Sequence, residues 1–169
     1  MIRNAVSSDI DSIMPIYERA RRFMAENGNP TQWTGGYPSR SVIESDIAAG
    51  RLFVCTAGDR IEGVFAFMLD AEPNYAVIEG AWLNDLPYGT IHRVASAGIR
   101  SGVASDIFNW CAERISNLRI DTHEDNRIMQ HILVKNGFVR CGIVHIRGGS
   151  PRIAFQRISA PADSIRQQI

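Results

Sequence analysis

The feature that most constrains this sequence is a strand that leads through a glycine-containing turn into a helix, between residues 90 and 105. Thr90 to Ala95 is the strand candidate, and Ser101 to Ile115 has the apolar spacing of a helix. Such a turn leaves successive backbone N–H groups unpaired at the positive end of the helix dipole. The unit predicts a site for pyrophosphate, although a turn of this kind also serves plain packing.

A second unit follows at once along the chain. Leu118 to His123 reads as a strand, and Asn126 to Lys135 reads as a helix that Asn136-Gly137 ends, with Phe138 after it. Alone, this is an ordinary amphipathic helix with a glycine cap and an apolar residue beyond it. In this order and at this spacing, the two units together are far more specific than either one.

The remaining pattern predicts one mixed α/β domain. Strands are expected at 2–6, 52–56, 61–69, 75–78, 139–146 and 153–157, and a loop at 79–89. One helix is expected to start at the capping box 8–11 and to end at Asn27-Gly28, and a second is expected at 41–49. A central sheet that is mostly antiparallel, and parallel around the helix at 101–115, accommodates this order. We expect the domain to cover residues 1–158, followed by a tail at 159–169.

Composition narrows the class of function. The formal net charge is zero, which gives no electrostatic reason to expect nucleic acid or an anionic membrane as partner. Cys55, Cys111 and Cys141 lie among apolar residues and match no zinc spacing, so neither a metal site nor a cysteine nucleophile is expected. The first residues show no signal-peptide core, and the apolar run 64–69 is too short to span a bilayer. These observations predict a cytoplasmic protein.

Together the two units resemble the GNAT (GCN5-related) family of N-acetyltransferases, over roughly residues 1–158. The family's phosphate loop runs Arg/Gln-x-x-Gly-x-Gly/Ala, which Gly102 and Ala104 match at the last two fixed positions. Its later helix runs from an Asn to a Gly-Phe pair, as this chain does from Asn126 to Phe138. The resemblance implies the GNAT fold: a central mixed, mostly antiparallel sheet with two splayed strands, flanked by helices, and acetyl-CoA in the cleft between those strands.

The resemblance also implies a set of donor-binding residues. Mapped by position, they are Val94, Ala95, Ser96, Arg100, Ser101, Gly102, Val103, Ala104, Ser105 and Asn126. Two departures stand out. Ile99 occupies the usual Arg/Gln position, with Arg100 next to it as a substitute. Leu133 stands where many members carry a Tyr that protonates the departing thiolate. Either another group protonates the sulfur, or the thiolate leaves unassisted. The second alternative is chemically acceptable, because a thiol with a pKa of about 8.5 gives a tolerable leaving group.

Direct transfer to an amine needs a base and an oxyanion site. His92 is the first candidate for the base, because it comes just before the acetyl-binding residues. Glu79 is the second, because the family often uses a carboxylate on the neighbouring strand, and His123 is the third. Each of the three also suits a purely structural role. A backbone N–H near Val94 or Ala95 is expected to stabilise the oxyanion.

The segment 28–38 is the candidate acceptor wall. It is rich in glycine and polar residues, yet it carries Trp33 and Tyr37. In GNAT folds this segment overhangs the open side of the cleft between the two splayed strands, where the acceptor enters opposite CoA. The two aromatic residues are therefore expected to bind the acceptor, and Gly35-Gly36 to let the segment move as a lid, unless the rings only fix the loop against the sheet.

The sequence thus predicts an acetyl-CoA-dependent N-acetyltransferase that acts on a primary amine of a small molecule or a peptide. The sequence is also compatible with a homodimer. Two alternatives remain. One is a non-catalytic acyl-CoA-sensing module of the same fold, which Leu133 favours. The other is a nucleotide-binding domain, which would need a Lys in the turn or an acidic ribose ligand about twenty residues further on. Asp121 is near that distance but lies within a strand.

Overall fold

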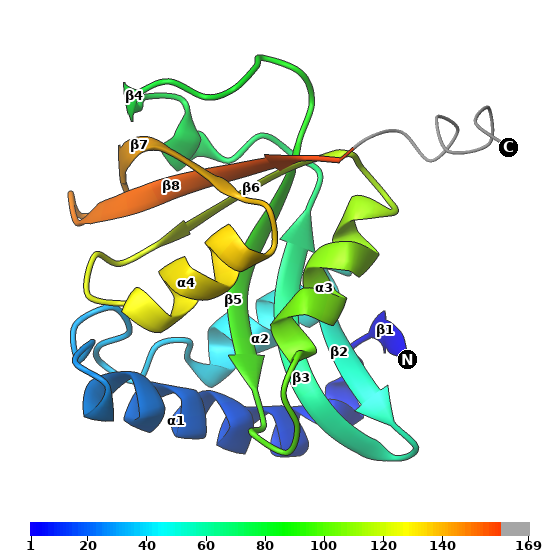
Figure 1. Cartoon of the computed structure of the whole chain (residues 1–169). Coiled ribbons are helices and arrows are strands. Elements are labelled where there is room, and N and C mark those ends of the chain that lie inside the picture. Colours follow the sequence, from blue (N-terminus) through cyan, green and yellow to red (C-terminus); the bar gives the residue numbers. More distant parts are fainter. Residues whose placement is uncertain (160–169) are drawn as a thin grey trace, which may run out of the picture.

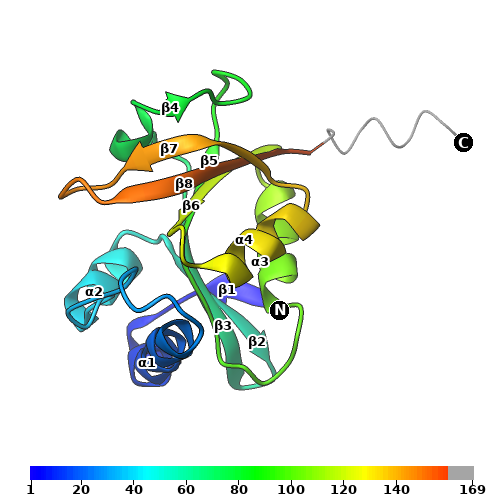
Figure 2. The same ribbon diagram turned by 60° about the vertical axis from the view of Figure 1, so that its left-hand side comes forward.

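A computed structural model describes residues 1–159, so the predicted tail beyond Ser159 lies outside the described residues. One eight-stranded sheet has the order β1-β2-β3-β5-β6-β8-β7-β4, and every neighbouring pair is antiparallel except β5 and β6 (Figure 1). Helices α1 and α2 lie on one side of the sheet and α3 and α4 on the other (Figure 2). The predicted fold class is confirmed.

The elements begin and end close to where the sequence pattern places most of them. They are β1 (Ile2–Asn4), a 3₁₀ turn (Ser7–Asp9), α1 (Ile10–Glu26), α2 (Arg40–Ala48), β2 (Leu52–Ala57), β3 (Arg60–Met68), a second 3₁₀ turn (Pro73–Tyr75), β4 (Glu79–Gly80), β5 (Gly89–Ser96), α3 (Val103–Ala112), β6 (Asn117–Thr122), α4 (Arg127–Lys135), β7 (Val139–His145) and β8 (Pro151–Ile158).

The predicted strand at 75–78 is wrong. A 3₁₀ turn ends at Tyr75 instead, because Pro73 has no N–H for a sheet and a fixed φ that suits the start of a helical turn. The Glu72 side chain caps this turn by accepting a hydrogen bond from the Asn74 N–H. The expected loop at 79–89 contains the short strand β4, which pairs with β7 at the edge of the sheet.

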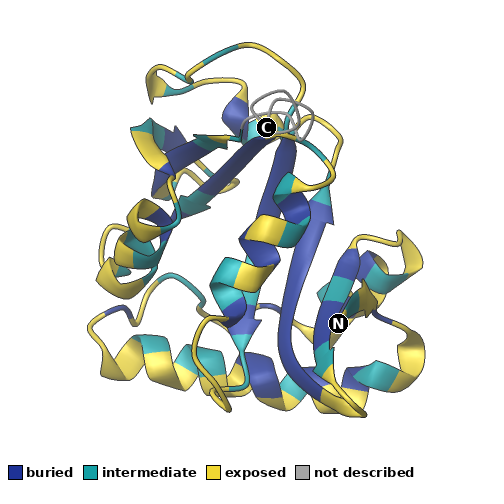
Figure 3. Cartoon of the chain, turned by 45° about the vertical axis from the view of Figure 1, so that its right-hand side comes forward, coloured by how far each residue is buried: buried dark blue, intermediate teal, exposed yellow. Residues whose placement is uncertain are grey.

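Two apolar cores lie on the two sides of the sheet. One packs Ile107 and Phe108 of α3 and Leu133 of α4 against strand residues such as Phe65 and Phe155. The other packs α1 and α2 against β2 and β3. Figure 3 shows the central strands as almost wholly buried. Burial on both sides fixes these strands as the rigid frame of the molecule.

Strand β5 contains one extra residue relative to β3. Val64 faces Ala95 while Ala66 faces His92, so two steps on β3 match three on β5, which is a β-bulge. Arg93 lies in the bulge with a φ of 54°, a left-handed conformation that is uncommon outside glycine. His92 and Arg93 are consecutive, yet both contact residues on the side of the sheet that carries α1 and α2.

Three side chains hold the bulge. The Tyr17 hydroxyl donates to the Arg93 carbonyl at 3.0 Å. The Arg93 guanidinium lies 2.6 Å from the Asp46 carboxylate and donates to the Tyr37 hydroxyl at 3.1 Å. The Arg93 and Asp46 side chains are only 13% and 9% exposed, so their charges compensate each other out of water.

Beyond its first two residues, β5 separates from β6. The parallel pairing joins Gly89 to Leu118 and Thr90 to Arg119 and then stops. From Ile91 onward β5 is paired with β3 on one side, and no strand among residues 1–159 is paired with its other edge. The expected splay of two strands is thus present.

None of the helices within residues 1–159 combines the length and apolar character needed to cross a bilayer.

Asp46→Asn should lower the free energy of unfolding by about 3 kcal/mol, because it leaves the buried Arg93 guanidinium without its counter-charge. Urea denaturation measures the difference. Asp11→Asn is the matched control: Asp11 pairs with Arg40 at 3.0 Å, but its side chain is 86% exposed, and its loss should cost less than about 1 kcal/mol. Equal effects of the two substitutions would show that the pair does not hold the bulge.

Candidate active site

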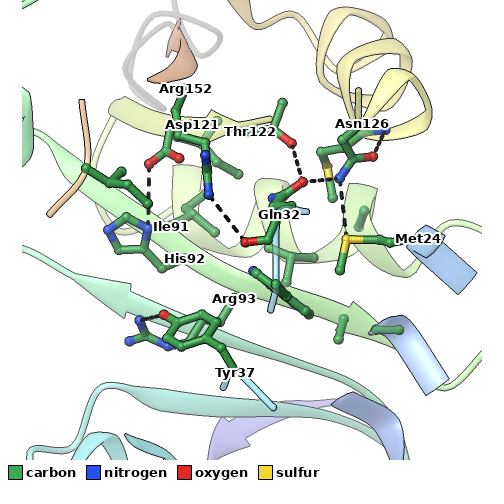
Figure 4. A pocket seen from close by; sticks show the side chains of 18 of the residues that line it. Met24, Gln32, Tyr37, Ile91, His92, Arg93, Asp121, Thr122, Asn126 and Arg152 are labelled. Atoms are coloured by element: carbon green, nitrogen blue, oxygen red, sulfur yellow. Dashed lines mark hydrogen bonds and ion pairs between the residues drawn. The ribbon is translucent and has the colours of Figure 1, made fainter. Parts of the chain in front are cut away.

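A cleft of about 990 Å³ opens where β5 and β6 separate (Figure 4). Its walls come from α1, the segment 31–37, β5, β6, the start of α3, α4 and the β7–β8 hairpin. The predicted site residues that line it are Trp33, Tyr37, His92, Val94, Ala95, Ser96, Val103, Ala104 and Asn126. Those that do not line it are Glu79, Arg100, Ser101, Gly102, Ser105 and His123.

The end of the cleft beside α3 has the features of an anion site. Gly102 is the N-cap of α3, with a φ of 83° that strongly favours glycine. Helical bonding begins with the Asp106 N–H, which donates to the Gly102 carbonyl, so the preceding amides have no helical acceptor. A Cβ on Gly102 would meet only an Arg100 nitrogen at 3.8 Å. Open space and unpaired donors therefore lie next to Val103 and Ala104.

The cation beside this end is Arg19 rather than Arg100. The Arg100 guanidinium donates to Glu62 at 2.7 Å and to Asp106 at 2.6 Å, and it holds the pKa of the Glu62 carboxyl below its usual value. Its charge is therefore already shared between two carboxylates. Arg19, on α1, lines the cleft and donates to the Ser96 carbonyl at 3.3 Å. Sequence reasoning missed it because it is 77 residues from its partner.

Asn126 lines the cleft, but both ends of its carboxamide already have partners. Its Oδ1 caps α4 by accepting from the Met129 N–H at 3.1 Å. Its Nδ2 donates to Gln32 Oε1 at 2.9 Å, and this oxygen also accepts from Asn29 Nδ2 at 2.8 Å. The segment 29–38 is thus tied to the start of α4. A lid movement would have to break these bonds.

His92 lies between the carboxylates of Glu72 and Asp121, and Figure 4 shows the one of Asp121. Its Nε2 is 2.9 Å from Glu72 Oε2, and its Nδ1 is 3.9 Å from Asp121 Oδ2. An ionised carboxylate only accepts hydrogen bonds, so the contact with Glu72 requires the proton on Nε2. In the neutral ring this leaves a lone pair on Nδ1, on the side of Asp121. His92 thus has the geometry of a general base.

Both carboxylates are themselves held in place. Glu72 Oε1 accepts from the backbone and side-chain amides of Asn74 at 3.1 and 2.8 Å. The hydrogen bond from His92 lowers the pKa of the Glu72 carboxyl, so this residue is ionised at neutral pH. The Tyr75 hydroxyl donates to Asp121 Oδ2 at 2.7 Å, and burial raises the pKa of Tyr75 well above its usual value. Tyr75 is thus a fixed donor that orients Asp121.

The other two candidate bases lie outside the cleft. Glu79 is on β4, its side chain is 70% exposed, and its carboxylate is 3.5 Å from His145. The neighbours of β5 are β3 and β6, so Glu79 is not the neighbouring-strand carboxylate that was expected. His123 Nδ1 accepts from the Asp125 N–H at 3.1 Å, and its Nε2 is 3.4 Å from the Thr31 hydroxyl. The structure therefore brings only His92 of the three into the cleft.

The α4 wall of the cleft has no proton donor at position 133. Leu133 is fully buried in the core between α4, α3 and the sheet. The residues of α4 that line the cleft are apolar: Ile128, Met129 and Ile132. This wall suits the hydrocarbon part of a ligand.

Trp33 and Tyr37 both line the cleft, and both also support the fold. The Trp33 ring packs edge-on against Tyr17 at 5.8 Å and against Tyr37 at 6.2 Å between centroids. The Tyr37 hydroxyl accepts from Arg93, so the segment is linked to the bulge of β5. Gly35 and Gly36, with φ of 61° and 75°, form the turn between the two rings.

The three cysteines take no part in this cleft. Burial raises the pKa of Cys55 to about 11 and raises that of Cys111 further, so both are thiols at neutral pH. Burial also raises the pKa of the Cys141 thiol. Within residues 1–159, no group of three or more His, Cys, Asp or Glu side chains is arranged to hold a metal ion.

Sequence reasoning missed Glu72, Arg152 and Gln32 and gave Asp121 no role at this site. A signal existed for Asp121, because a charged residue within a predicted buried strand needs a partner or a ligand. Arg152 lies just before the strand predicted at 153–157, and the observed strand β8 includes it. Glu72 and Gln32 lie in loops, and nothing in their local pattern indicates which part of the sheet they approach.

Scans of the sequence against family models and against curated proteins found no match. Among solved structures, the chain is similar to a GNAT family acetyltransferase from Streptococcus agalactiae. The two sequences are 36% identical, the alignment covers 95% of this chain and 96% of that one, and the TM-score is 0.84.

Two more distant structures share the fold. A GNAT family acetyltransferase from Listeria monocytogenes is 19% identical, with a TM-score of 0.68 and 94% of each chain covered. A GNAT-like decarboxylase in complex with isobutyryl-CoA is 13% identical, with a TM-score of 0.63 and coverage of 94% of this chain and 98% of that one.

Proposed function

Because this chain belongs to the GNAT family of acetyltransferases, we propose that it transfers an acetyl group from acetyl-CoA directly to a primary amine. Family membership supports acyl transfer in general. The observation that carries the proposal of an amine acceptor is the cluster of His92, Glu72 and Asp121, at the point where β5 and β6 part. An imidazole with a free lone pair beside a carboxylate attracts an ammonium group and removes its proton.

The donor site is proposed to follow the free edge of β5. The pyrophosphate of CoA would bind the amides in the first turn of α3, with Arg19 as the nearby cation. The pantetheine arm would pair with the backbone of residues 94–96 and pack against the apolar wall of α4. The complex of the distant GNAT-like decarboxylase with isobutyryl-CoA supports an acyl-CoA donor. Acetyl as the acyl group is part of the proposal.

The acceptor amine is proposed to bind on the other side, next to His92 Nδ1 and Asp121 Oδ2. These two atoms are 3.9 Å apart, so a single nitrogen can lie about 2.9 Å from both. The ammonium form is attracted by Asp121, and Nδ1 then takes its proton. Glu72 holds the ring in the required tautomer through Nε2 and stabilises the imidazolium that forms.

The neutral amine then attacks the thioester carbonyl. The C–N bond forms as the carbonyl oxygen becomes an oxyanion, which a backbone N–H of the bulged strand near Val94 or Ala95 would stabilise. The attached nitrogen then loses its second proton to solvent, the carbonyl re-forms, the C–S bond breaks and CoA leaves as the thiolate. Since Leu133 has no proton to give, protonation of the sulfur is left to solvent, which a thiol pKa of about 8.5 permits.

Gly102→Glu tests the phosphate site. It adds a like charge and a strained backbone at the start of α3, so CoA binding measured by calorimetry should weaken at least about ten-fold, or 1.4 kcal/mol. Gly58→Glu is the matched control, because Gly58 also has a positive φ (58°) and open space around it, but lies in the β2–β3 turn outside the cleft. A folded Gly102→Glu protein with unchanged affinity would exclude this phosphate site.

His92→Ala tests the base. It should lower kcat about 100-fold and leave the KM for acetyl-CoA nearly unchanged, because the imidazole acts on the amine and not on the donor. His131→Ala is the control, since His131 is exposed on α4 and outside the cleft. A normal kcat in His92→Ala would transfer the role of base to Asp121 or to a water molecule.

Trp33→Ala tests the acceptor wall. It should raise the KM for the acceptor without changing the affinity for acetyl-CoA, because Trp33 lines the acceptor side of the cleft beside Tyr37. Trp33→Phe keeps an aromatic ring and should retain most of the activity. If Trp33→Ala only lowers the Tm, with normal kinetics for both substrates, the residue is structural.

A further inference from the structure

Arg152 is a buried cation in the wall of the cleft. The residue is 6% exposed and lines the cleft. Its guanidinium donates only to neutral oxygens: the Ser150 hydroxyl at 2.5 Å, the Pro151 carbonyl at 3.0 Å and the Gln32 carbonyl at 3.3 Å. No salt bridge joins it to a carboxylate among residues 1–159. Burial lowers the pKa of the Arg152 guanidinium.

The other guanidinium groups that are largely buried contact a carboxylate or aromatic ring faces, and no such contact is found for Arg152 within residues 1–159. Arg93 has the Asp46 carboxylate at 2.6 Å. Arg119, which is 5% exposed, lies over the ring faces of Trp82 at 4.2 Å and Tyr88 at 3.9 Å. The charge of Asp121 favours the protonated form of Arg152 but makes no salt bridge with it. A buried charge is costly unless it is paired, so a buried cation that faces a cleft and contacts no counter-charge indicates an anionic ligand.

Arg152 lies on the same face of the sheet as the proposed base. Asp121 faces Ala154 across β6 and β8, and Arg152 is two residues from Ala154 on β8. Diagonal neighbours of this kind are about 7–8 Å apart, which long side chains can bridge. Figure 4 shows Arg152 reaching toward Gln32 beside Asp121, with His92 below them. One small ligand in the cleft would therefore contact all three of Arg152, Asp121 and His92.

We propose that the acceptor is an amino acid, whose carboxylate binds Arg152 while its amino group lies between His92 and Asp121. This inference rests on the proposed function and names its substrate class. A carboxylate matches the planar guanidinium and places a single negative charge in the part of the cleft that also holds Asp121 and Glu72, where a phosphate would place two.

The test compares the twenty proteinogenic L-amino acids with their carboxamides, which keep the amine and lack the anion. Acetyl-CoA is the donor, released CoA is measured, and calorimetry in the presence of CoA measures the binding of the same probes. For the preferred side chain, we expect the acid to exceed the amide in kcat/KM by about thirty-fold or more, or 2 kcal/mol. Equal use of acid and amide, or a preference for O-phosphoethanolamine, would overturn the proposal.

Arg152→Met should abolish the preference by lowering kcat/KM for the acid to the level of the amide, with little effect on the amide itself. Arg152→Lys keeps the charge but cannot make the bidentate contact, so its preference for the acid over the amide should lie between those of the wild type and Arg152→Met. Arg157→Met is the matched control: it removes the same charge from the same strand, but Arg157 donates to Asn109 of α3 and is outside the cleft, so the preference should persist.

The outcomes separate this proposal from the proposed function. Acetylation of acids and amides alike would overturn the carboxylate site and leave amine acetylation standing. Tight binding of the acid over the amide, without release of CoA, would support the carboxylate site and overturn the transfer. Probes that neither bind nor react would overturn the proposal. If Arg152→Met does not fold, the wild-type comparison and Arg152→Lys still decide.

Discussion

The site depends on one extra residue in β5. A regular strand would place His92 and Arg93 on opposite sides of the sheet, whereas the bulge places both on the same side. Arg93 then fastens the strand to α2 through Asp46, and its carbonyl to α1 through Tyr17. This leaves His92 directed at Asp121. A left-handed conformation costs about 1–3 kcal/mol, which the surrounding contacts must offset. The position of the proposed base therefore depends on the two helices that hold the bulge.

The sheet also separates two chemical environments at β6. Its residues alternate, so Leu118 and Ile120 enter the apolar core beneath α3 and α4, while Arg119 and Asp121 lie on the opposite face. The strand that supports the core on one side thus carries the charged site on the other. Because β5 parts from β6 just after Thr90, the two environments meet in the cleft. A thioester from the apolar side and an amine from the polar side would meet at that opening.

Local signals in the sequence indicate the residues of the proposed donor side, as well as His92, Trp33 and Tyr37, but they do not indicate the charged residues around His92. Glycine at a helix start, as at Gly102, and Asn126 as an N-cap are properties of a few consecutive residues, so the sequence displays them. Glu72 reaches His92 only through the 3₁₀ turn that Pro73 begins, in the region where the pattern predicted a strand. Arg152 lies next to Asp121 only through the pairing of β6 with β8. Such contacts depend on strand order and register, which periodicity does not reveal.

The distribution of titratable groups indicates which half of the reaction the protein assists. The proposed acceptor side has an imidazole with a fixed tautomer, because Glu72 holds the proton on Nε2 of His92. The proposed donor side has the apolar wall of α4, where Leu133 and the lining residues Ile128, Met129 and Ile132 have no proton to give to sulfur. An alkyl ammonium has a pKa near 10, so deprotonation at neutral pH is demanding, whereas a CoA thiolate is a good leaving group. The charged side chains, which are the most costly to bury, therefore lie on the side where the amine would be deprotonated.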